Sequence, residues 1–192
     1  MSLIPLGFWA ASGGGGGAGA FDLLETQILT SSASSVTFTG LGAYSGYKHL
    51  QIRYTARTDQ AASGTSFMIA RFNGDSGSNY SYHYLAEENG VISAASTSKT
   101  YSRVGRLARA NNTTGSFASG VYEILDYTST SKNKTSRSLS GNVTGQAAPF
   151  GPQVSFTSSA WYSTSAITSL VLTDIAAANF ITGTRFSLYG VK

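Results

Sequence analysis

The feature that most constrains this chain is a period-two alternation of apolar and polar residues that recurs after residue 20. Leu50, Ile52 and Tyr54 alternate with polar residues at 51, 53 and 55, and Val36 and Phe38 alternate with threonines. Successive side chains of a β-strand point to opposite faces of a sheet, so this period predicts half-buried strands. No segment shows the 3.6-residue period of a helix that packs on a core, and the pattern therefore predicts an all-β fold.

Gly, Ser, Asn and Asp clusters separate these runs, as expected of turns between strands. The segment 73–79 (NGDSGSN) is expected to form a hairpin turn, 87–90 a turn, and 174–179 a single helical turn. Short strands without helices favour an antiparallel β-sandwich of the jelly-roll type, which we expect to span residues 21–192 as one domain. The strands are expected at 36–39, 50–57, 67–72, 80–84, 121–127, 154–157, 167–172 and 186–191.

Composition limits the chemistry of the chain. Charged residues make up only 11% of it, against roughly 25% in typical soluble domains, and Ser, Thr and Gly fill the deficit. We therefore expect hydroxyls and backbone groups, rather than ions, to solvate the surface. The chain has no cysteine, which excludes disulfides, thiolate nucleophiles and Cys-based metal sites. The net charge of +4 is spread along the chain, whereas nucleic-acid modules concentrate their basic residues, so no nucleic-acid partner is expected.

Residues 1–20 differ from the rest. An apolar head precedes five consecutive glycines, Gly13–Gly17, which supply no side chains for packing. The head lacks the basic start of a signal peptide, and no apolar run reaches the 18 residues of a membrane span, so membrane insertion is not expected. The segment is either a flexible linker or an anchoring arm, and large aromatic side chains favour the arm. Its candidate anchoring residues are Leu3, Ile4, Leu6, Phe8 and Trp9.

The residues that could carry catalysis show no motif. His49 and His83 belong to no metal-binding spacing, and the chain has no G-x-S-x-G nucleophile elbow. Glu123 and Asp126 have opposite parity on one expected strand, so they cannot form a glycosidase pair there. The 73–79 segment has oxygen side chains at alternate positions but lacks EF-hand spacing, which favours a turn over a calcium site. We expect no enzyme activity, no metal and no cofactor.

Aromatic residues are the candidate binding groups. Tyr80, Tyr82 and Tyr84 share one face of an expected strand, and Trp161 and Tyr162 are expected in a separate Ser/Thr-rich loop. Aromatic faces can stack on sugar rings while neighbouring hydroxyls hydrogen-bond to them. The alternative is that these rings pack the core or a subunit interface with their polar atoms at the rim.

Three stretches together resemble small structural proteins of tailed bacteriophage particles: LIPLGFWAASGGGGG at the start, ARFNGDSGSNYSYHYL at 70–85, and ITSLVLTDIAAANFITGTRFSLYGVK at the end. The resemblance implies a trimeric jelly-roll subunit of the virion, attached through its N-terminus to other virion proteins, and it brings no catalytic residues. Residues 93–165 carry no resemblance.

The leading hypothesis is a tail fibre or appendage subunit whose outward surface contacts a host-surface glycan. The alternatives are a head decoration protein that stabilises the capsid and, from a different class, a free carbohydrate-binding module. The sequence does not distinguish a protein of the phage head from one of the phage tail.

Overall fold

The computed structural model describes residues 19–87, 90–146 and 151–192. The expected anchoring residues Leu3, Ile4, Leu6, Phe8 and Trp9, and the middle of the expected turn at 87–90, lie outside this part of the chain. Twelve strands and one short 3-10 helix, η1 (Leu41–Tyr44), form the described part. The strands are β1 (Phe21–Ile28), β2 (Val36–Phe38), β3 (His49–Ala56), β4 (Ser66–Phe72), β5 (Tyr80–Glu87), β6 (Val91–Lys99), β7 (Ser102–Leu107), β8 (Ala118–Leu125), β9 (Lys134–Asn142), β10 (Gln153–Trp161), β11 (Leu170–Asp174) and β12 (Arg185–Val191).

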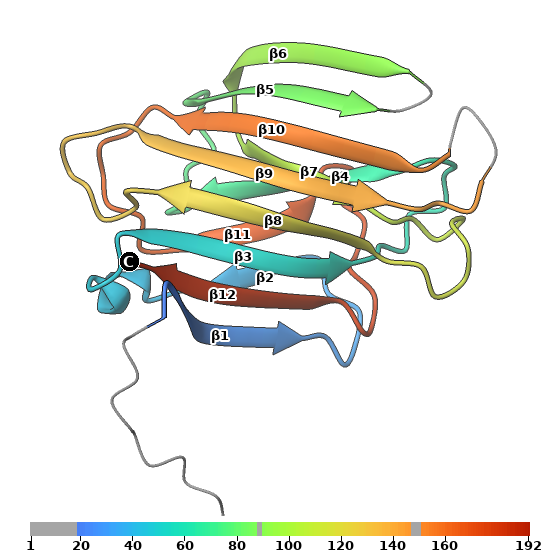
Figure 1. Cartoon of the computed structure of the whole chain (residues 1–192), viewed down its shortest axis with the longest axis horizontal. Coiled ribbons are helices and arrows are strands. Elements are labelled where there is room, and N and C mark those ends of the chain that lie inside the picture. The colour runs from blue at the N-terminus through green and yellow to red at the C-terminus, as the bar shows by residue number, and fades with distance from the viewer. Residues whose placement is uncertain (1–18, 88–89, 147–150) are drawn as a thin grey trace, which may run out of the picture.

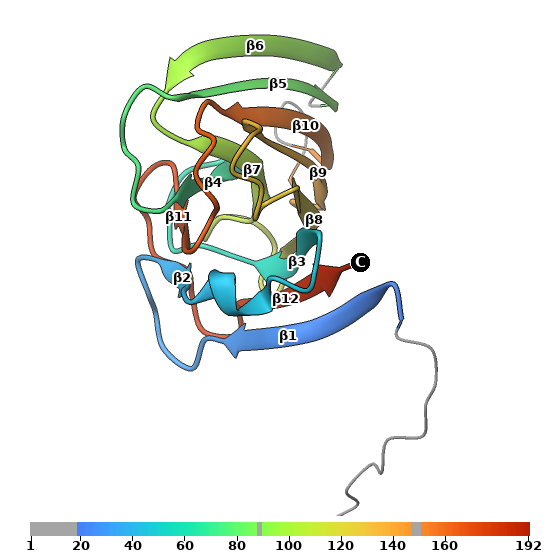
Figure 2. The same ribbon diagram turned by 90° about the vertical axis from the view of Figure 1, so that its left-hand side faces the viewer.

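The strands form two antiparallel sheets packed against each other, which confirms the all-β sandwich (Figure 1). The large sheet has the order β1-β12-β3-β8-β9-β10-β5-β6, and the small sheet has the order β2-β11-β4-β7. The large sheet is therefore the wider layer. Its β5–β6 end extends past β7, the edge strand of the small sheet (Figure 2).

An apolar core fills the space between the small sheet and the β12, β3 and β8 strands. The alternation noted at Leu50, Ile52 and Tyr54 places all three side chains inward, where they meet Phe186 and Leu188 of β12. Phe186 also packs edge-on against the ring of Phe180, with ring centroids 5.3 Å apart. Here the period-two pattern and the burial agree, because one face of each strand is apolar and turned inward.

The interior is polar where β9 and β10 cover β7. The buried side chains on the inner faces of β9 and β10 are almost all hydroxyls and amides: Ser136, Ser138, Ser140, Asn142, Gln153, Ser155, Thr157 and Ser159. They form hydrogen bonds such as Ser159 Oγ to the carbonyl of Arg103 (3.2 Å) and the amide of Arg106 to Ser140 Oγ (3.0 Å). Part of the hydroxyl-rich composition therefore lies inside the sandwich, and not only on the surface as expected.

Two expected local structures differ from the observed ones. The segment at 73–79 does turn, with Asn73 and Gly74 at positive φ. It does not close a hairpin, because β4 and β5 lie in different sheets. After β11, Asp174 begins a tight turn closed by the amide of Ala177 (3.1 Å) instead of a helical turn. The φ of Ala177, 57°, ends any helical path there.

Candidate functional site

Tyr80 is a core residue, so its expected role in surface binding is wrong. Its side chain is fully buried. The hydroxyl donates to the carbonyl of Asp75 (3.2 Å) and accepts from the amide of Phe72 (3.1 Å). Burial raises the pKa of Tyr80 to about 12, so the phenol stays neutral and keeps its donor role. Tyr80 thus ties the inter-sheet turn to the core.

Trp161 is also buried, and the expected loop is in fact the end of β10. The side chain is only 3% exposed and lies 5.5 Å from the Phe72 ring. Its Nε1 donates to Asp75 Oδ2 at 2.6 Å. Burial opposes ionisation of Asp75, but the hydrogen bonds from Trp161, Asn79 and the amide of Gly77 outweigh it and lower its pKa. The surface-binding expectation for Trp161 is therefore wrong.

Tyr162 does lie at the surface, 54% exposed, directly after β10. Its hydroxyl is 2.9 Å from Ser81 Oγ on β5. The structure therefore divides the five expected binding aromatics: Tyr80 and Trp161 are in the core, Tyr162 is alone on the surface, and Tyr82 and Tyr84 belong to a cluster.

The tyrosine–arginine edge, comprising Phe67, Tyr82, Tyr84, Tyr101 and Arg103, lies where the β5–β6 end of the large sheet passes β7. The Arg103 guanidinium carbon lies 3.5 Å from the Phe67 ring centroid and 3.8 Å from that of Tyr84, so the cation is held between two rings. Tyr82 stacks on Tyr101 with centroids 6.0 Å apart and an interplanar angle of 23°. Cations over aromatic faces are attracted by the ring quadrupole.

The edge contains a buried cation, which is unusual, and the pKa values of its titratable groups are shifted. Arg103 is 7% exposed, and its Nε and Nη2 have no hydrogen-bond partner among the described residues. Burial lowers the pKa of Arg103, and repulsion from Arg106 adds to that effect. Burial also raises the pKa of Tyr101 to about 12, with a further contribution from its hydrogen bond to Tyr82. For Tyr82, hydrogen bonds from Ser96 and Tyr101 and the charge of Arg103 outweigh burial and lower the pKa.

A β-bulge positions the members of this edge that lie beyond β5. The pairing of β5 with β6 shifts between Tyr80 and Tyr82, and Ser98 on β6 has a φ of 53°. Bulges re-aim side chains and are common beside binding sites. Tyr101, Phe67 and Arg103 could not be recognised from the sequence, because β4, β5, β7 and the β6–β7 connection meet only in the folded sandwich.

The outer face of the large sheet carries a second feature, an apolar row. Val121, Leu139, Phe156 and Leu85 are direct cross-strand neighbours on β8, β9, β10 and β5. Phe156 is 57% exposed, and Leu139 and Leu85 are about half exposed. Such a contiguous row differs from the isolated exposed apolar residues of ordinary surfaces and indicates an interaction site.

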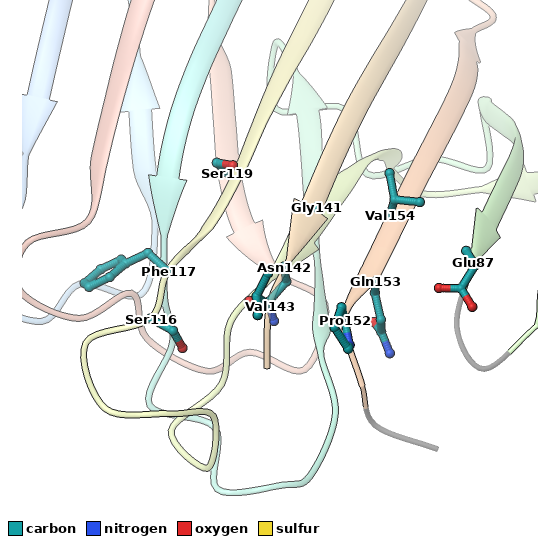
Figure 3. Close-up of a pocket in the computed structure, with 10 residues that line it drawn as sticks. All are labelled: Glu87, Ser116, Phe117, Ser119, Gly141, Asn142, Val143, Pro152, Gln153 and Val154. Carbon is teal, nitrogen blue, oxygen red and sulfur yellow. The ribbon is translucent and has the colours of Figure 1, made fainter. Parts of the chain in front are cut away.

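Hollows lie in this outer apolar row and beside it. One of about 440 Å³ is lined by Val121, Leu139 and Phe156. Another, of about 450 Å³, lies at the ends of β9 and β10, where Figure 3 shows Val143, Pro152 and Val154 with Phe117 on one side and Glu87 on the other. The row is hidden in the sequence because Phe156 and Leu139 are apolar and would conventionally be assigned to the core side of their strands.

Polar groups border the row on one side. Glu123 forms an ion pair with the Nε of Arg137 and accepts a hydrogen bond from Gln51 (3.0 Å), which in turn accepts one from Arg53 (2.8 Å). Burial would raise the pKa of Glu123, but the bonds from Arg137 and Gln51 outweigh it and lower the pKa. The outer face thus places the acidic Glu123 and the basic Arg137 and Arg53 beside the apolar row.

Neither histidine belongs to the tyrosine–arginine edge or to the apolar row. His49 Nδ1 accepts the backbone amide of Asp126 at 2.9 Å, while His83 pairs across the sheet with Ser158 and Ala95. Within the described ranges, no three His, Cys, Asp or Glu side chains come together in a way that could hold a metal ion. Likewise, no helix in the described part of the chain is long and apolar enough to cross a membrane.

Comparison with known proteins supplies no relative. No family model, no curated protein and no solved structure matches the chain.

Proposed function

We propose that this protein is a non-enzymatic structural subunit of a phage particle that assembles with copies of itself through the outer face of the large sheet. The observation that carries the proposal is the outer apolar row, Val121, Leu139, Phe156 and Leu85, which crosses four neighbouring strands. Leu139, Phe156 and Leu85 are about half exposed, and Val121 is partly buried. Aromatic residues at the centre of an apolar patch are typical anchors of protein interfaces.

A second copy of the chain is the occupant that the charges on this face favour. Arg137 and Glu123 lie beside the row, and Arg137 is largely exposed. The same face therefore offers an acidic and a basic group, which suits charge pairing between copies of the chain in the head-to-tail contact of a closed ring. The closed trimer implied by the resemblance is the assembly we propose.

The strand order supports a jelly roll within the sandwich. Without the β5–β6 and β9–β10 hairpins, the sheets read β1-β12-β3-β8 and β2-β11-β4-β7, with late strands inserted between early ones. Interleaving of this kind is what two Greek keys produce in a jelly roll. The two hairpins then act as additions that widen the large sheet, and they provide three of the four strands of the apolar row.

The assembly proposal predicts the effect of charge within the row. Leu139→Asp is expected to convert the full-length oligomer into a monomer, because each subunit would bury an unpaired carboxylate at the interface. Light scattering after size exclusion measures the mass against the chain mass of 20.0 kDa. Ile175→Asp is the matched control, since Ile175 is similarly exposed but follows β11 in the small sheet.

Circular dichroism of both variants must show the native strand content, and Phe156→Asp provides a second substitution in the row. A wild-type chain that stays monomeric at high concentration contradicts the proposal. So does an oligomer that survives both row substitutions in folded protein.

The virion role predicts the effect of removing the arm. Deleting residues 1–18 is expected to leave the sandwich folded, because β1 begins at Phe21 and Ala20 still accepts the amide of Lys192 (3.4 Å). The truncated subunit is expected to be lost from purified particles, as measured by mass spectrometry of separated heads and tails. Detection of the full chain in tails supports the appendage role, and detection in heads supports decoration. Full incorporation of the truncated chain contradicts anchoring by the arm.

A further inference from the structure

We propose that the tyrosine–arginine edge, Phe67, Tyr82, Tyr84, Tyr101 and Arg103, binds an acidic saccharide. The phenol rings would stack on sugar rings, and the neighbouring cations would hold the carboxylate. This site lies apart from the outer apolar row and goes beyond the assembly role, so binding at the edge and assembly can be tested separately.

Arg103 is the first reason to expect a ligand. Its guanidinium is more than nine-tenths buried, and two of its nitrogens have no partner among the described residues. It forms no ion pair with a carboxylate in the described part of the chain, where its charge faces the rings of Phe67, Tyr84 and Tyr82 and interacts with the Tyr82 hydroxyl. A buried cation without an anion is costly. An arriving carboxylate would relieve that cost and match the fork of donors on arginine.

Besides Arg106, whose guanidinium carbon lies 4.5 Å from the Phe67 ring centroid, other basic residues lie near the same edge. Lys99 and Arg71 are half-buried and lie close enough to act electrostatically on Tyr82 and Tyr101, respectively. Arg71 also donates to the carbonyl of Thr100 at 3.0 Å. Neither is ion-paired within the described residues, whereas Lys132, Arg137 and Lys192 each contact a carboxylate. The edge therefore concentrates uncompensated positive charge from three strands.

The tyrosines supply the part of the site that would recognise a sugar. Tyr82, Tyr84 and Tyr101 are all partly exposed, so their faces and hydroxyls reach the surface. Tyr82 lies 6.4 Å from Tyr84 and 6.0 Å from Tyr101, centroid to centroid, which forms a continuous aromatic platform. The charge of Arg103 beside the Tyr82 hydroxyl also makes that phenol a stronger hydrogen-bond donor.

A saccharide fits this platform better than a nucleic acid does. Single-stranded nucleic acids need a basic groove that follows several phosphates. Here Arg103, Lys99 and Arg71 act on the neighbouring Tyr82 and Tyr101 phenols, which suits a single carboxylate beside a stacked ring. Ser96 and Thr100 add hydroxyl and backbone groups at the rim of the platform.

Titration calorimetry of the full-length protein at low ionic strength tests the proposal. The probes are tetragalacturonate, the neutral maltotetraose and a ten-nucleotide oligothymidylate. Tetragalacturonate is expected to bind at least tenfold more tightly than maltotetraose. Lys99→Gln is expected to weaken tetragalacturonate binding about two- to fivefold, and Tyr101→Leu about three- to tenfold. Lys48→Gln makes the same charge change at an exposed position outside the edge and is expected to have no effect.

Equal binding of the acidic and neutral saccharides overturns the proposal, as does binding of oligothymidylate alone. Unchanged affinity in both Lys99→Gln and Tyr101→Leu also overturns it. Light scattering of the Lys99→Gln variant should show the wild-type mass, so failure of saccharide binding is distinguishable from failure of assembly. Lys99→Gln avoids the core, which keeps the test independent of the stability of the fold.

Discussion

Replacing Trp161 by alanine is expected to lower the free energy of unfolding by about 3–5 kcal/mol, the range for removing a large core aromatic. The loss has two sources. The indole ring packs between Phe72 and Tyr80, with centroids 5.5 and 6.2 Å away, so its removal leaves a cavity. Its Nε1 also donates to Asp75 Oδ2, and without it this partly buried carboxylate loses a hydrogen bond that supports the turn between the two sheets.

Thermal denaturation of the full chain checks this result. For a domain of this size, the expected fall in melting temperature is about 6–20 °C. Tyr162→Ala is the matched control, because Tyr162 is the next residue in the chain but is 54% exposed, and its loss is expected to change the melting temperature only slightly. Similar melting temperatures for the two variants would contradict the placement of Trp161 in the core.

Arg57→Ala is the second substitution with a large expected effect, a loss of about 3–5 kcal/mol. Arg57 follows β3 and is buried. Its Nη1 donates to the carbonyls of Thr113 and Ser116, and its Nη2 donates to those of Ala110 and Asn112, all at 2.8–2.9 Å. One guanidinium therefore holds the whole β7–β8 connection, and alanine would leave four carbonyls without their shared donor.

Urea denaturation measures this effect through the transition midpoint, provided that the slope is unchanged. Arg57→Lys is expected to recover only a small part of the lost stability, because an ammonium group cannot present two forked pairs of donors. Arg185→Ala removes an exposed arginine at the start of β12 and serves as the control. If Arg57→Ala unfolds at the wild-type urea concentration, the hydrogen bonds of Arg57 do not stabilise the β7–β8 connection, and the prediction is wrong.

The sequence predicted the architecture well wherever one face of a strand was apolar and turned inward. The run at 50–57 and the end of the chain are examples: Leu50, Ile52 and Leu188 lie in the core as their alternation required. Strands with small polar side chains were missed for the same physical reason. In the 134–142 segment serine alternates with residues of different kinds. It therefore has no alternation of apolar and polar residues that would indicate a strand.

The functional surfaces were harder to predict because the pattern is inverted on β9 and β10. Phe156 and Leu139 point to solvent, while Thr157 and Ser138 point inward. In a prediction from sequence, the apolar side of a strand is assigned to the core. For β9 and β10 that rule assigns the wrong face to the interior. Tyr80, Tyr82 and Tyr84 show a different limit. They share one face, as predicted, but the small sheet covers only the first of them completely, because the large sheet extends beyond β7.

The hydroxyl-lined layer between β7 and the β9–β10 hairpin has a calorimetric consequence. Exposing apolar surface raises the heat capacity on unfolding, whereas exposing polar surface lowers it, so the two contributions oppose each other. A sandwich that buries two rows of serine, threonine and amide side chains in place of aliphatic ones gains less heat capacity when it unfolds. The curve of its free energy of unfolding against temperature is correspondingly broad. The free energy of unfolding is therefore similar at low and at moderately high temperature.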